Sequence, residues 1–405
     1  MSKSTFFTGQ PIFNQVLNFI PRGSVNMIAR DLNADRYCKS FKTYEHLVTM
    51  LYAILNQCTS LREVTTGMLA WDRRIEHLGL NSHPRRSTFA DANQRRSDEV
   101  FEKIYFHLLN RYKAVLPDSS KRSRKNNVYI FDSTSITLFQ EILKGAGLSK
   151  TDGRRKGGIK VHTLLRVDQD VPCMIRYSAA AANDRQFLKE VRLPAGSVII
   201  FDKGYNDYKA YNQLAEQQIT WVTRLQARSV YTVIQPVEVS DYQRQNGVIS
   251  DQYIELGHSH SSKAVKVDAR LIKFKDPVSK RKFEFISCNR KISSLSIALY
   301  YKQRWQIETF FKRIKQNYPL QYFLGDNENA IKIQIWCSLI ADLLIKVIKQ
   351  GSRSTMSYSN ITGLIRLHLM TYMKLSDFLK SPEKTLLLRI KRHRMEFIYP
   401  SLFSP

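Results

Sequence analysis

Two short segments of this chain share one design, and together they constrain its fold more than any other feature. Residues 129–134 read Tyr-Ile-Phe-Asp-Ser-Thr and residues 199–204 read Ile-Ile-Phe-Asp-Lys-Gly, so each places an aspartate, Asp132 or Asp202, where an apolar strand ends. A carboxylate in an apolar setting carries a desolvation penalty unless it is paired or binds a cation. On adjacent strands the two ends would form a divalent-metal site. Taken singly, each aspartate could instead start a turn or cap a helix.

The ligand types favour particular metals. Oxygen-only ligation suits magnesium or manganese, and no His/Cys cluster of the kind that binds zinc is present. The 5 cysteines are scattered without a Cys-x-x-Cys pair, which predicts reduced thiols that mostly lie in the core.

The order of elements around the two aspartates predicts the fold class. Three strands in a row, then helix, strand, helix and strand, is the order expected of an α/β, ribonuclease-H-like mixed sheet with helices on its faces. A β-rich insertion should follow at about residues 226–290, where short β-prone runs are broken by Gly247, Gly257 and Pro277. The expected strands are 128–131, 160–167, 173–178, 198–201 and 220–225, and the expected helices are 186–192 and 208–217.

Both ends of the chain have helical periodicity. We expect a helical DNA-binding domain at 1–120, a catalytic domain at 121–325 that contains the β-rich insertion, and a helical C-terminal region at 326–405. Residues 331–348 should be the best-buried helix.

The charge of the chain predicts a polyanionic partner. Lys and Arg number 63 against 35 Asp and Glu, a formal net charge of +28. An anionic membrane surface is the alternative to nucleic acid, but the positive charge is spread from Lys3 to Arg394 rather than confined beside a hydrophobic anchor. The first ten residues lack an apolar signal core, and the longest apolar stretch is too short to span a bilayer. We therefore expect a cytoplasmic protein that binds double-stranded DNA and no membrane.

A third carboxylate lies in a segment that we expect to form one helix from Ser294 to beyond Lys315. At about 100° per residue, Tyr301, Arg304, Glu308 and Lys315 share one face. A charged, solvent-facing stripe would give the same pattern. The opposite stripe, which should pack on the sheet, consists of Ile307, Phe310, Phe311 and Ile314.

Aromatic residues near this face are candidate DNA contacts. Trp305 lies at its edge and could stack on an unpaired or flipped base, or pack against its neighbours. Tyr205 and Tyr301 could donate hydrogen bonds to phosphate, or pack against the sheet. His162, on the second strand, is interpreted as a sheet histidine with its hydrogen bonds satisfied.

Two basic segments are further candidates. Pro84 should end one element, and Ser87 or Thr88 should cap a basic helix, an arrangement typical of a DNA-reading unit but also of an Arg-rich helix in an ordinary bundle. Residues 153–158 predict a flexible basic loop that contacts backbone phosphate. The candidate DNA-binding residues in these two segments are Arg85, Arg86, Asn93, Arg95, Arg96, Arg154, Arg155 and Lys156.

These pieces together resemble a known family. The spacing of Tyr301, Arg304, Glu308 and Lys315 resembles the Y-R-E-K signature of the DDE transposases of the bacterial insertion-sequence-four family. Residues 202–205, Asp-Lys-Gly-Tyr, are similar to the family's second block, and residues 131–133 are similar to its first. The resemblance spans about residues 125–325, and residues 87–96 resemble the family's N-terminal segment more loosely.

The resemblance implies a function and roles for these residues. Asp132, Asp202 and Glu308 would hold two Mg²⁺ or Mn²⁺ ions, and Arg304, Lys315 and Tyr301 would act beside them on the scissile phosphate. The chain would bind the terminal inverted repeats of its element, cleave there and join the 3′ ends to target DNA. The family further implies a homodimer on DNA, a hairpin intermediate and a bacterial, nucleoid-associated protein. A metal-dependent nuclease and an inactive, transposase-derived repressor are the alternatives.

Overall fold

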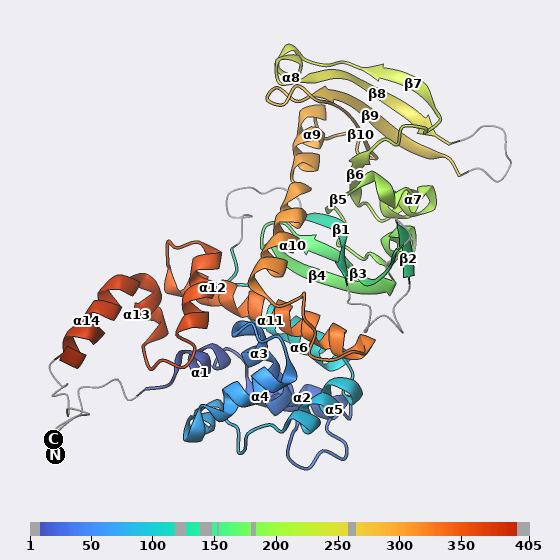
Figure 1. Ribbon diagram of the computed structural model, residues 1–405. Coiled ribbons are helices and arrows are strands. Elements are labelled where there is room, and N and C mark those ends of the chain that lie inside the picture. Colours follow the sequence, from blue (N-terminus) through green and yellow to red (C-terminus); the bar gives the residue numbers. More distant parts are fainter. Residues whose placement is uncertain are drawn as a thin grey trace, which may run out of the picture. The chain divides into compact units, whose positions relative to one another are not determined.

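A computed structural model describes residues 9–117, 127–137, 148–151, 154–179, 184–257 and 265–394 (Figure 1). The chain divides into two compact units. A helical unit contains residues 1–117 and 313–405, and a sheet unit contains residues 118–312.

The sheet unit has the expected ribonuclease-H-like core. Its strand order is β4-β3-β1-β5-β6, in which β1, β5 and β6 are parallel and β3 is antiparallel to both of its neighbours. This mixed order confirms the fold class predicted from the sequence. The strands are β1 (Val128–Thr137), β3 (Arg154–Arg166), β4 (Val171–Ala179), β5 (Val198–Phe201) and β6 (Thr220–Arg224).

Apolar runs explain why the centre of this sheet is buried. All four residues of β5 are buried, as expected of a parallel strand covered on both faces. Helix α7 (Tyr208–Glu216) begins where the Asp207 side chain accepts a hydrogen bond from the Ala210 amide, and the Tyr211 ring stacks on Trp221 of β6 at 4.6 Å. The 3₁₀ helices η4 (Asp184–Glu190) and η5 (Lys203–Tyr205) flank β5 in sequence.

The β-rich insertion continues the same sheet instead of forming a separate one. Beyond β6 the order is β10-β9-β8-β7, and every pairing is antiparallel (Figure 1). The insertion comprises β7 (Tyr231–Val237), α8 (Asp241–Gln245), β8 (Val248–Leu256), β9 (Val267–Lys275) and β10 (Lys282–Ser287).

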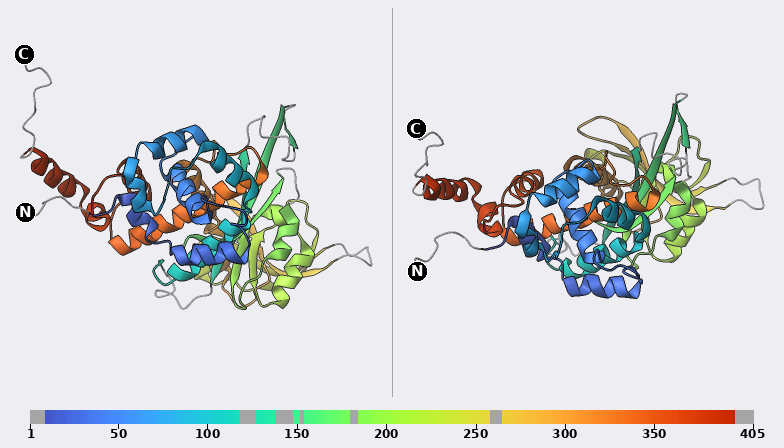
Figure 2. Two further views of the ribbon diagram at one scale, coloured as in Figure 1. Left: turned by 90° about the horizontal axis from the view of Figure 1, so that it is seen from below. Right: turned by 60° about the horizontal axis from the view of Figure 1, so that its bottom comes forward.

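Three local predictions were wrong. Strand β1 does not end at Asp132 but continues to Thr137, because β3 pairs with it along this whole length. Residues 154–158 are not a loop. They begin β3, which forms a hairpin with β2 (Leu148–Thr151) that extends from the sheet (Figure 2), while residue 153 lies outside the described part. The single expected helix is two helices, α9 (Ser294–Lys302) and α10 (Trp305–Asn317).

Helices make up the other unit, as expected of both ends of the chain. Helix α11 (Glu328–Ser352) contacts α3, α5, α6, α12 and α13, and nearly all of its residues from Ala330 to Ile348 are buried. In the described part of the chain, no helix has the length and apolarity needed to cross a membrane. The other elements are α1 (Ile12–Leu17), α2 (Arg22–Asp31), α3 (Thr43–Leu55), α4 (Leu61–Leu69), η1 (Asp72–Leu78), α5 (Arg86–Arg95), α6 (Glu99–Tyr112), α12 (Tyr358–Leu367), α13 (Leu375–Lys380) and α14 (Pro382–Arg394).

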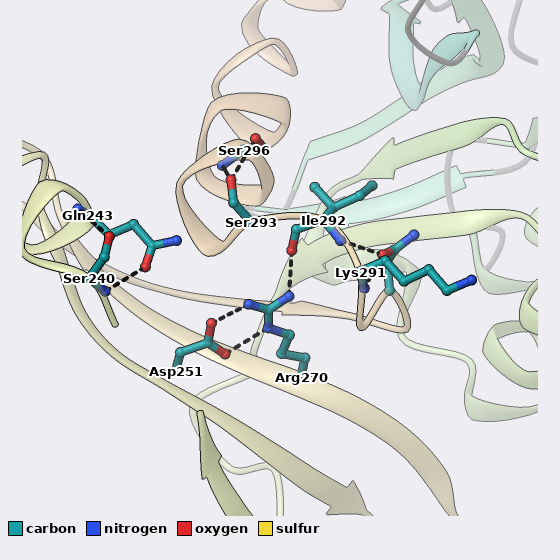
Figure 3. Close-up of polar contacts among 9 residues, drawn as sticks. Ser240, Gln243, Asp251, Arg270, Lys291, Ile292, Ser293 and Ser296 are labelled. Atoms are coloured by element: carbon teal, nitrogen blue, oxygen red, sulfur yellow. Dashed lines mark hydrogen bonds and ion pairs between the residues drawn. The ribbon is translucent and has the colours of Figure 1, made fainter. Parts of the chain in front are cut away.

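A buried ion pair joins the insertion to the start of α9 (Figure 3). Arg270 of β9 donates from Nε to Asp251 Oδ1 of β8 at 2.8 Å, and its Nη1 donates to the carbonyl oxygen of Ile292. Asp251 and Arg270 are only 2% and 5% exposed. Ser293 follows directly and caps α9 by accepting a hydrogen bond from the Ser296 amide. The insertion therefore fixes the point at which α9 begins.

We predict that Asp251→Ala strongly destabilises the protein, because it leaves the Arg270 guanidinium buried without its counter-ion. The expected loss is about 3–5 kcal/mol of unfolding free energy, measured by denaturant titration. Asp268→Ala is the matched control, since Asp268 lies on β9, the strand of Arg270, but forms an exposed ion pair with Arg290 and should contribute about 0–1 kcal/mol. Equal losses for the two variants would contradict the prediction.

Candidate active site

Two aspartates lie on neighbouring strands of the core sheet, Asp132 within β1 and Asp202 directly after β5. Strands β1 and β5 are parallel, and their pairing ends with Phe131 opposite Phe201, so Asp132 and Asp202 follow at the same level. Buried rings hold this register, with Phe131 packing against Tyr205 at 4.9 Å between centroids. The side chains of Asp132 and Asp202 are 18% and 35% exposed, so both carboxylates can be reached from solvent.

Side chains from α9 and α10, and from the turn between them, meet these aspartates. The Tyr301 hydroxyl donates a hydrogen bond to Asp202 Oδ1 at 3.2 Å. Arg304 bridges two carboxylates, with Nη1 3.3 Å from Asp132 Oδ2 and Nη2 2.5 Å from Glu308 Oε1. The structure thus brings together Asp132, Asp202, Tyr301, Arg304 and Glu308 within the sheet unit.

The break between α9 and α10 is part of this arrangement. Arg304 lies in the turn, where its amide donates to the Tyr301 carbonyl oxygen at 3.0 Å. From there its side chain reaches both β1 and the first turn of α10. The apolar stripe behaves as expected at Ile307 and Phe310, which are buried at 0% and 2% exposure.

Arg224, the last residue of β6, belongs to this cluster but was not predicted from the sequence. Its Nη2 lies 4.0 Å from Asp202 Oδ1, and its guanidinium lies 5.8 Å from the centre of the Tyr301 ring. Its Nε is buried and has no hydrogen-bond partner among the described residues. The signal was present, because residues 220–224, Thr-Trp-Val-Thr-Arg, repeat the design of a mainly apolar strand that ends in a charged residue.

Burial and like charge shift the protonation of this cluster. Burial is the main cause that raises the pKa of Asp132 to about 6, and the Asp202 and Glu308 carboxylates raise it further. The Ser133 amide and the Arg304 guanidinium act in the opposite direction. Burial also raises the pKa of Tyr301 to about 12, so its hydroxyl remains a hydrogen-bond donor at neutral pH.

The donor set fits a divalent cation. Asp132 and Glu308 both contact Arg304, and Asp202 accepts a hydrogen bond from Tyr301; oxygen ligands of this kind suit Mg²⁺ or Mn²⁺. As they stand, no three His, Cys, Asp or Glu side chains of the described residues lie close enough to hold a metal ion together. Arg304 supplies the positive charge between Asp132 and Glu308, so a cation that binds both would replace its contacts.

Several predicted DNA-binding residues lie elsewhere. Tyr205 is 2% exposed and packs in the core, so its interpretation as a phosphate contact was wrong. Trp305 is 67% exposed, which rules out the packing interpretation in the described chain. Lys315 is exposed on the part of α10 that belongs to the helical unit. The side chains of Arg154, Arg155 and Lys156 lie outside the part that the structure describes.

The basic helix α5 differs most from expectation. It begins at Arg86, before Ser87 and Thr88, and has no side-chain cap. Asn93 and Arg96 are buried at 1% and 4% exposure and cannot reach DNA, because both bind His46 in the interior. Of the predicted contacts in this segment, Arg85, Arg86 and Arg95 are exposed.

We predict a pH-dependent effect of Asp132→Asn in buffer without divalent cations. A pKa raised to about 6 means that the folded chain holds this proton more tightly than the unfolded chain, whose value lies near 3.8. The stability contributed by this group is therefore present below about pH 4 and lost as the pH rises through about 6. The melting temperature of the variant relative to the parent should be higher at pH 7.5 than at pH 4.5.

The matched control for this measurement is Asp268→Asn, whose carboxylate is exposed. Losing the Arg304 contact lowers the stability of Asp132→Asn at both pH values. The prediction therefore concerns only how the melting-temperature difference between variant and parent changes from pH 4.5 to pH 7.5. A constant difference across this range would show that Asp132 titrates normally.

Comparison with known proteins agrees with this geometry. The family model described as "Transposase DDE domain" matches residues 123–344, more than half of the chain, and the model described as "Domain of unknown function (DUF4372)" matches residues 8–81. The relative named "Putative transposase y4zB", from Sinorhizobium fredii, is 29% identical over 324 residues, covering 78% of this chain and 87% of its own. The "Putative transposase for insertion sequence element IS4SA" of Synechocystis sp. is 23% identical over 265 residues, covering 65% of this chain and 71% of its own.

A solved structure, "Cryo-EM structure of piggyBac transposase synaptic complex with hairpin DNA (SNHP)", aligns with 97% of this chain and 85% of its own at a TM-score of 0.41 and 12% identity, a likeness too weak to carry an argument. The family match carries the identification, because it spans more than half of the chain and includes β1, which carries Asp132, and Asp202 directly after β5. The chain belongs to the DDE transposases, metal-dependent enzymes that cut and transfer DNA strands.

Proposed function

We propose that this chain is the transposase of a bacterial insertion sequence in the Y-R-E-K branch of its family. It binds the terminal inverted repeats of its element, cleaves the DNA there and joins the 3′ ends to target DNA. The observation that carries the proposal is the convergence of Asp132, Asp202 and Glu308 on Arg304 and Tyr301.

The three carboxylates would hold two divalent ions, Mg²⁺ or Mn²⁺. When bound, such ions activate water or a 3′-hydroxyl and stabilise the leaving oxygen. Asp132 suits this role because burial and two neighbouring carboxylates make its lone negative charge unfavourable. A cation in this place relieves that cost.

The arginines would bind the scissile phosphate. A guanidinium stays protonated in proteins and forms paired hydrogen bonds with phosphate oxygens. Arg304 holds Asp132 and Glu308 in the free chain, and in the active complex we expect it to turn from these carboxylates to the DNA backbone. Arg224, with its buried and unpartnered Nε, is a second phosphate donor beside Asp202, and Lys315 is a third on α10.

DNA binding beyond the site follows from the charge of the chain. A net charge of +28 favours a polyanion along much of the surface. We propose that residues 1–120 contact the inverted repeats, that residues 121–325 carry out the chemistry, and that the chain acts as a homodimer on DNA. Arg85, Arg86 and Arg95 remain proposed DNA contacts because their side chains are exposed.

We predict that Asp132→Asn, Asp202→Asn and Glu308→Gln each abolish strand cleavage but keep DNA binding, because the affinity of a basic protein for DNA comes mainly from its many cations. Supercoiled plasmid that carries the element's ends is incubated with Mg²⁺, with Mn²⁺ or with a chelator, and nicked, linear and strand-transfer products are separated on gels. Gel shifts on the same preparations measure binding.

Asp268→Asn is the control for loss of one carboxylate in the same unit, and it should cleave like the parent. Cleavage that persists in chelator would exclude the metal mechanism. A variant that cuts at the parental rate would remove its residue from the site. Nicks without any strand-transfer product would favour the nuclease alternative, and binding without cleavage by the parent would favour the repressor.

We predict that Trp305→Ala slows the strand step after the first nick more than the first nick itself. An exposed indole beside Arg304 can stack on an extruded base, and such stacking is worth ~1–3 kcal/mol, or about thirtyfold in rate at the middle of that range. Trp305→Phe is the matched variant and should retain most of the rate, because it keeps an aromatic face. Single-turnover assays resolve the two steps.

An abasic nucleotide near the cleavage point provides a second measurement for Trp305. It lowers the cost of extruding a base, so it should partly rescue Trp305→Ala. Uniform slowing of every step without rescue at any position would refute base stacking.

A further inference from the structure

The helical unit contains a cleft of about 690 Å³ that the proposed catalytic residues do not use. Arg22 of α2, Lys39 and Lys42 before α3, and Arg85 before α5 line it, together with the carboxylate of Glu45. Four basic side chains thus face one acidic side chain. A concentration of cations in a concave surface favours an anionic partner.

The single carboxylate is already engaged. Glu45 accepts hydrogen bonds from Arg22 Nη2 at 3.0 Å and from the backbone amide of Lys42 at 3.1 Å. In the chain as described, the exposed ammonium and guanidinium groups of Lys39, Lys42 and Arg85 form no ion pair with a carboxylate. Their charge is therefore available to a ligand.

Other polar groups lie beside these cations. His83 lines the cleft, and its Nε2 is buried without a hydrogen-bond partner among the described residues. The exposed residues Ser40, Ser82 and Thr88 add hydroxyl groups to the lining. Lysine, arginine and hydroxyl side chains are the groups with which proteins contact DNA phosphates.

A buried arginine fixes the loop at one side of the cleft. Arg96 Nη2 donates to Asp35 Oδ1 at 3.2 Å and to the Phe41 carbonyl oxygen at 3.0 Å, and Asp35 also accepts the Thr43 amide at 2.7 Å. This network holds residues 35–43 in one conformation. Arg96, which the sequence suggested as a DNA contact, therefore supports the loop from inside.

The same loop presents an aromatic side chain to solvent. Tyr37 is 87% exposed, and the Arg36 guanidinium lies 4.9 Å from its ring centre. The backbone of Tyr37 has a φ of 62°, a left-handed conformation that costs energy for a residue with a side chain. A fixed, exposed tyrosine next to unpaired cations is typical of a nucleic-acid contact surface.

We propose that this cleft, with the loop 35–43, binds the sugar-phosphate backbone of the transposon-end DNA. The inference rests on the proposed function, because it takes end DNA as the substrate. It assigns a ligand to a surface formed largely by residues 8–81, the segment matched by a domain model of unknown function. The cleft holds the DNA and takes no part in the chemistry.

The test compares two double variants of the full chain. Lys39→Gln/Arg85→Gln removes two cations from the cleft, and Lys380→Gln/Lys384→Gln removes two exposed cations from another cleft of the same unit, of about 840 Å³. The net charge changes equally in both. Fluorescence anisotropy measures binding to a duplex that carries the element's end and to a random duplex, over a range of salt concentrations.

We expect the first variant to lose about tenfold or more in affinity for end DNA and the control to bind like the parent. The slope of log K against log salt should fall in magnitude by about two, since each lost phosphate contact removes about 0.9. Equal losses in both double variants, or an unchanged salt slope in the first, would overturn the proposal. Melting temperatures should match the parent, because all four side chains are exposed.

The outcome is separable from that of the proposed catalytic function. At protein concentrations that saturate the DNA, Lys39→Gln/Arg85→Gln should cleave at the parental rate, whereas the carboxylate variants should not cleave at any concentration. Loss of cleavage at saturation would place these residues in the chemistry and overturn the cleft as a binding surface. If Lys39→Gln/Arg85→Gln binds end DNA as tightly as the parent and only the carboxylate variants lose cleavage, the cleft is not the DNA-binding surface. The proposed transposase function would then still stand.

Discussion

The parallel pairing of β1 with β5 is the constraint on which the site depends. It aligns Phe131 with Phe201, and therefore places the two aspartates that follow them side by side next to a hydrophobic core. Burial disfavours the charged form of Asp132, neighbouring carboxylates add repulsion, and the raised pKa of Asp132 reflects both effects. The surrounding side chains offset these effects. Arg304, Arg224 and Tyr301 all direct their polar ends to these carboxylates.

The β-rich insertion contributes to this arrangement through its attachment to α9. Strand β10 pairs with β6, so the insertion lengthens the sheet that carries the aspartates. Arg270, neutralised by Asp251, then holds the Ile292 carbonyl oxygen just before α9 begins. Because Tyr301 lies near the end of that helix, the position of its hydroxyl depends on an ion pair in the insertion as well as on local packing. The insertion is thus continuous with the core in both hydrogen bonding and charge.

Local patterns and non-local contacts explain which features the sequence could predict. The strands that lead to Asp132 and Asp202, and the apolar stripe with Ile307 and Phe310, were predictable because they depend on neighbouring residues in the chain. Asn93 and Arg96 were not, because their burial depends on His46 and on the Leu324 carbonyl oxygen, both distant in sequence. The hairpin of β2 with β3 and the break before Trp305 likewise depend on pairing and packing partners. Arg224 was predictable in principle, because a charged residue at the end of a strand is the same local pattern that identified the two aspartates.

Helix α10 sets the spacing between two of the proposed site residues, Glu308 and Lys315. It begins in the sheet unit with Trp305 and Glu308 and continues into the helical unit with Lys315. An α-helix rises about 1.5 Å per residue, so Glu308 and Lys315 stand roughly 10 Å apart along its axis. That separation is set by backbone hydrogen bonds within a single element. The spacing between the carboxylate and the lysine is therefore a property of the helix itself and needs no side-chain contact to maintain it.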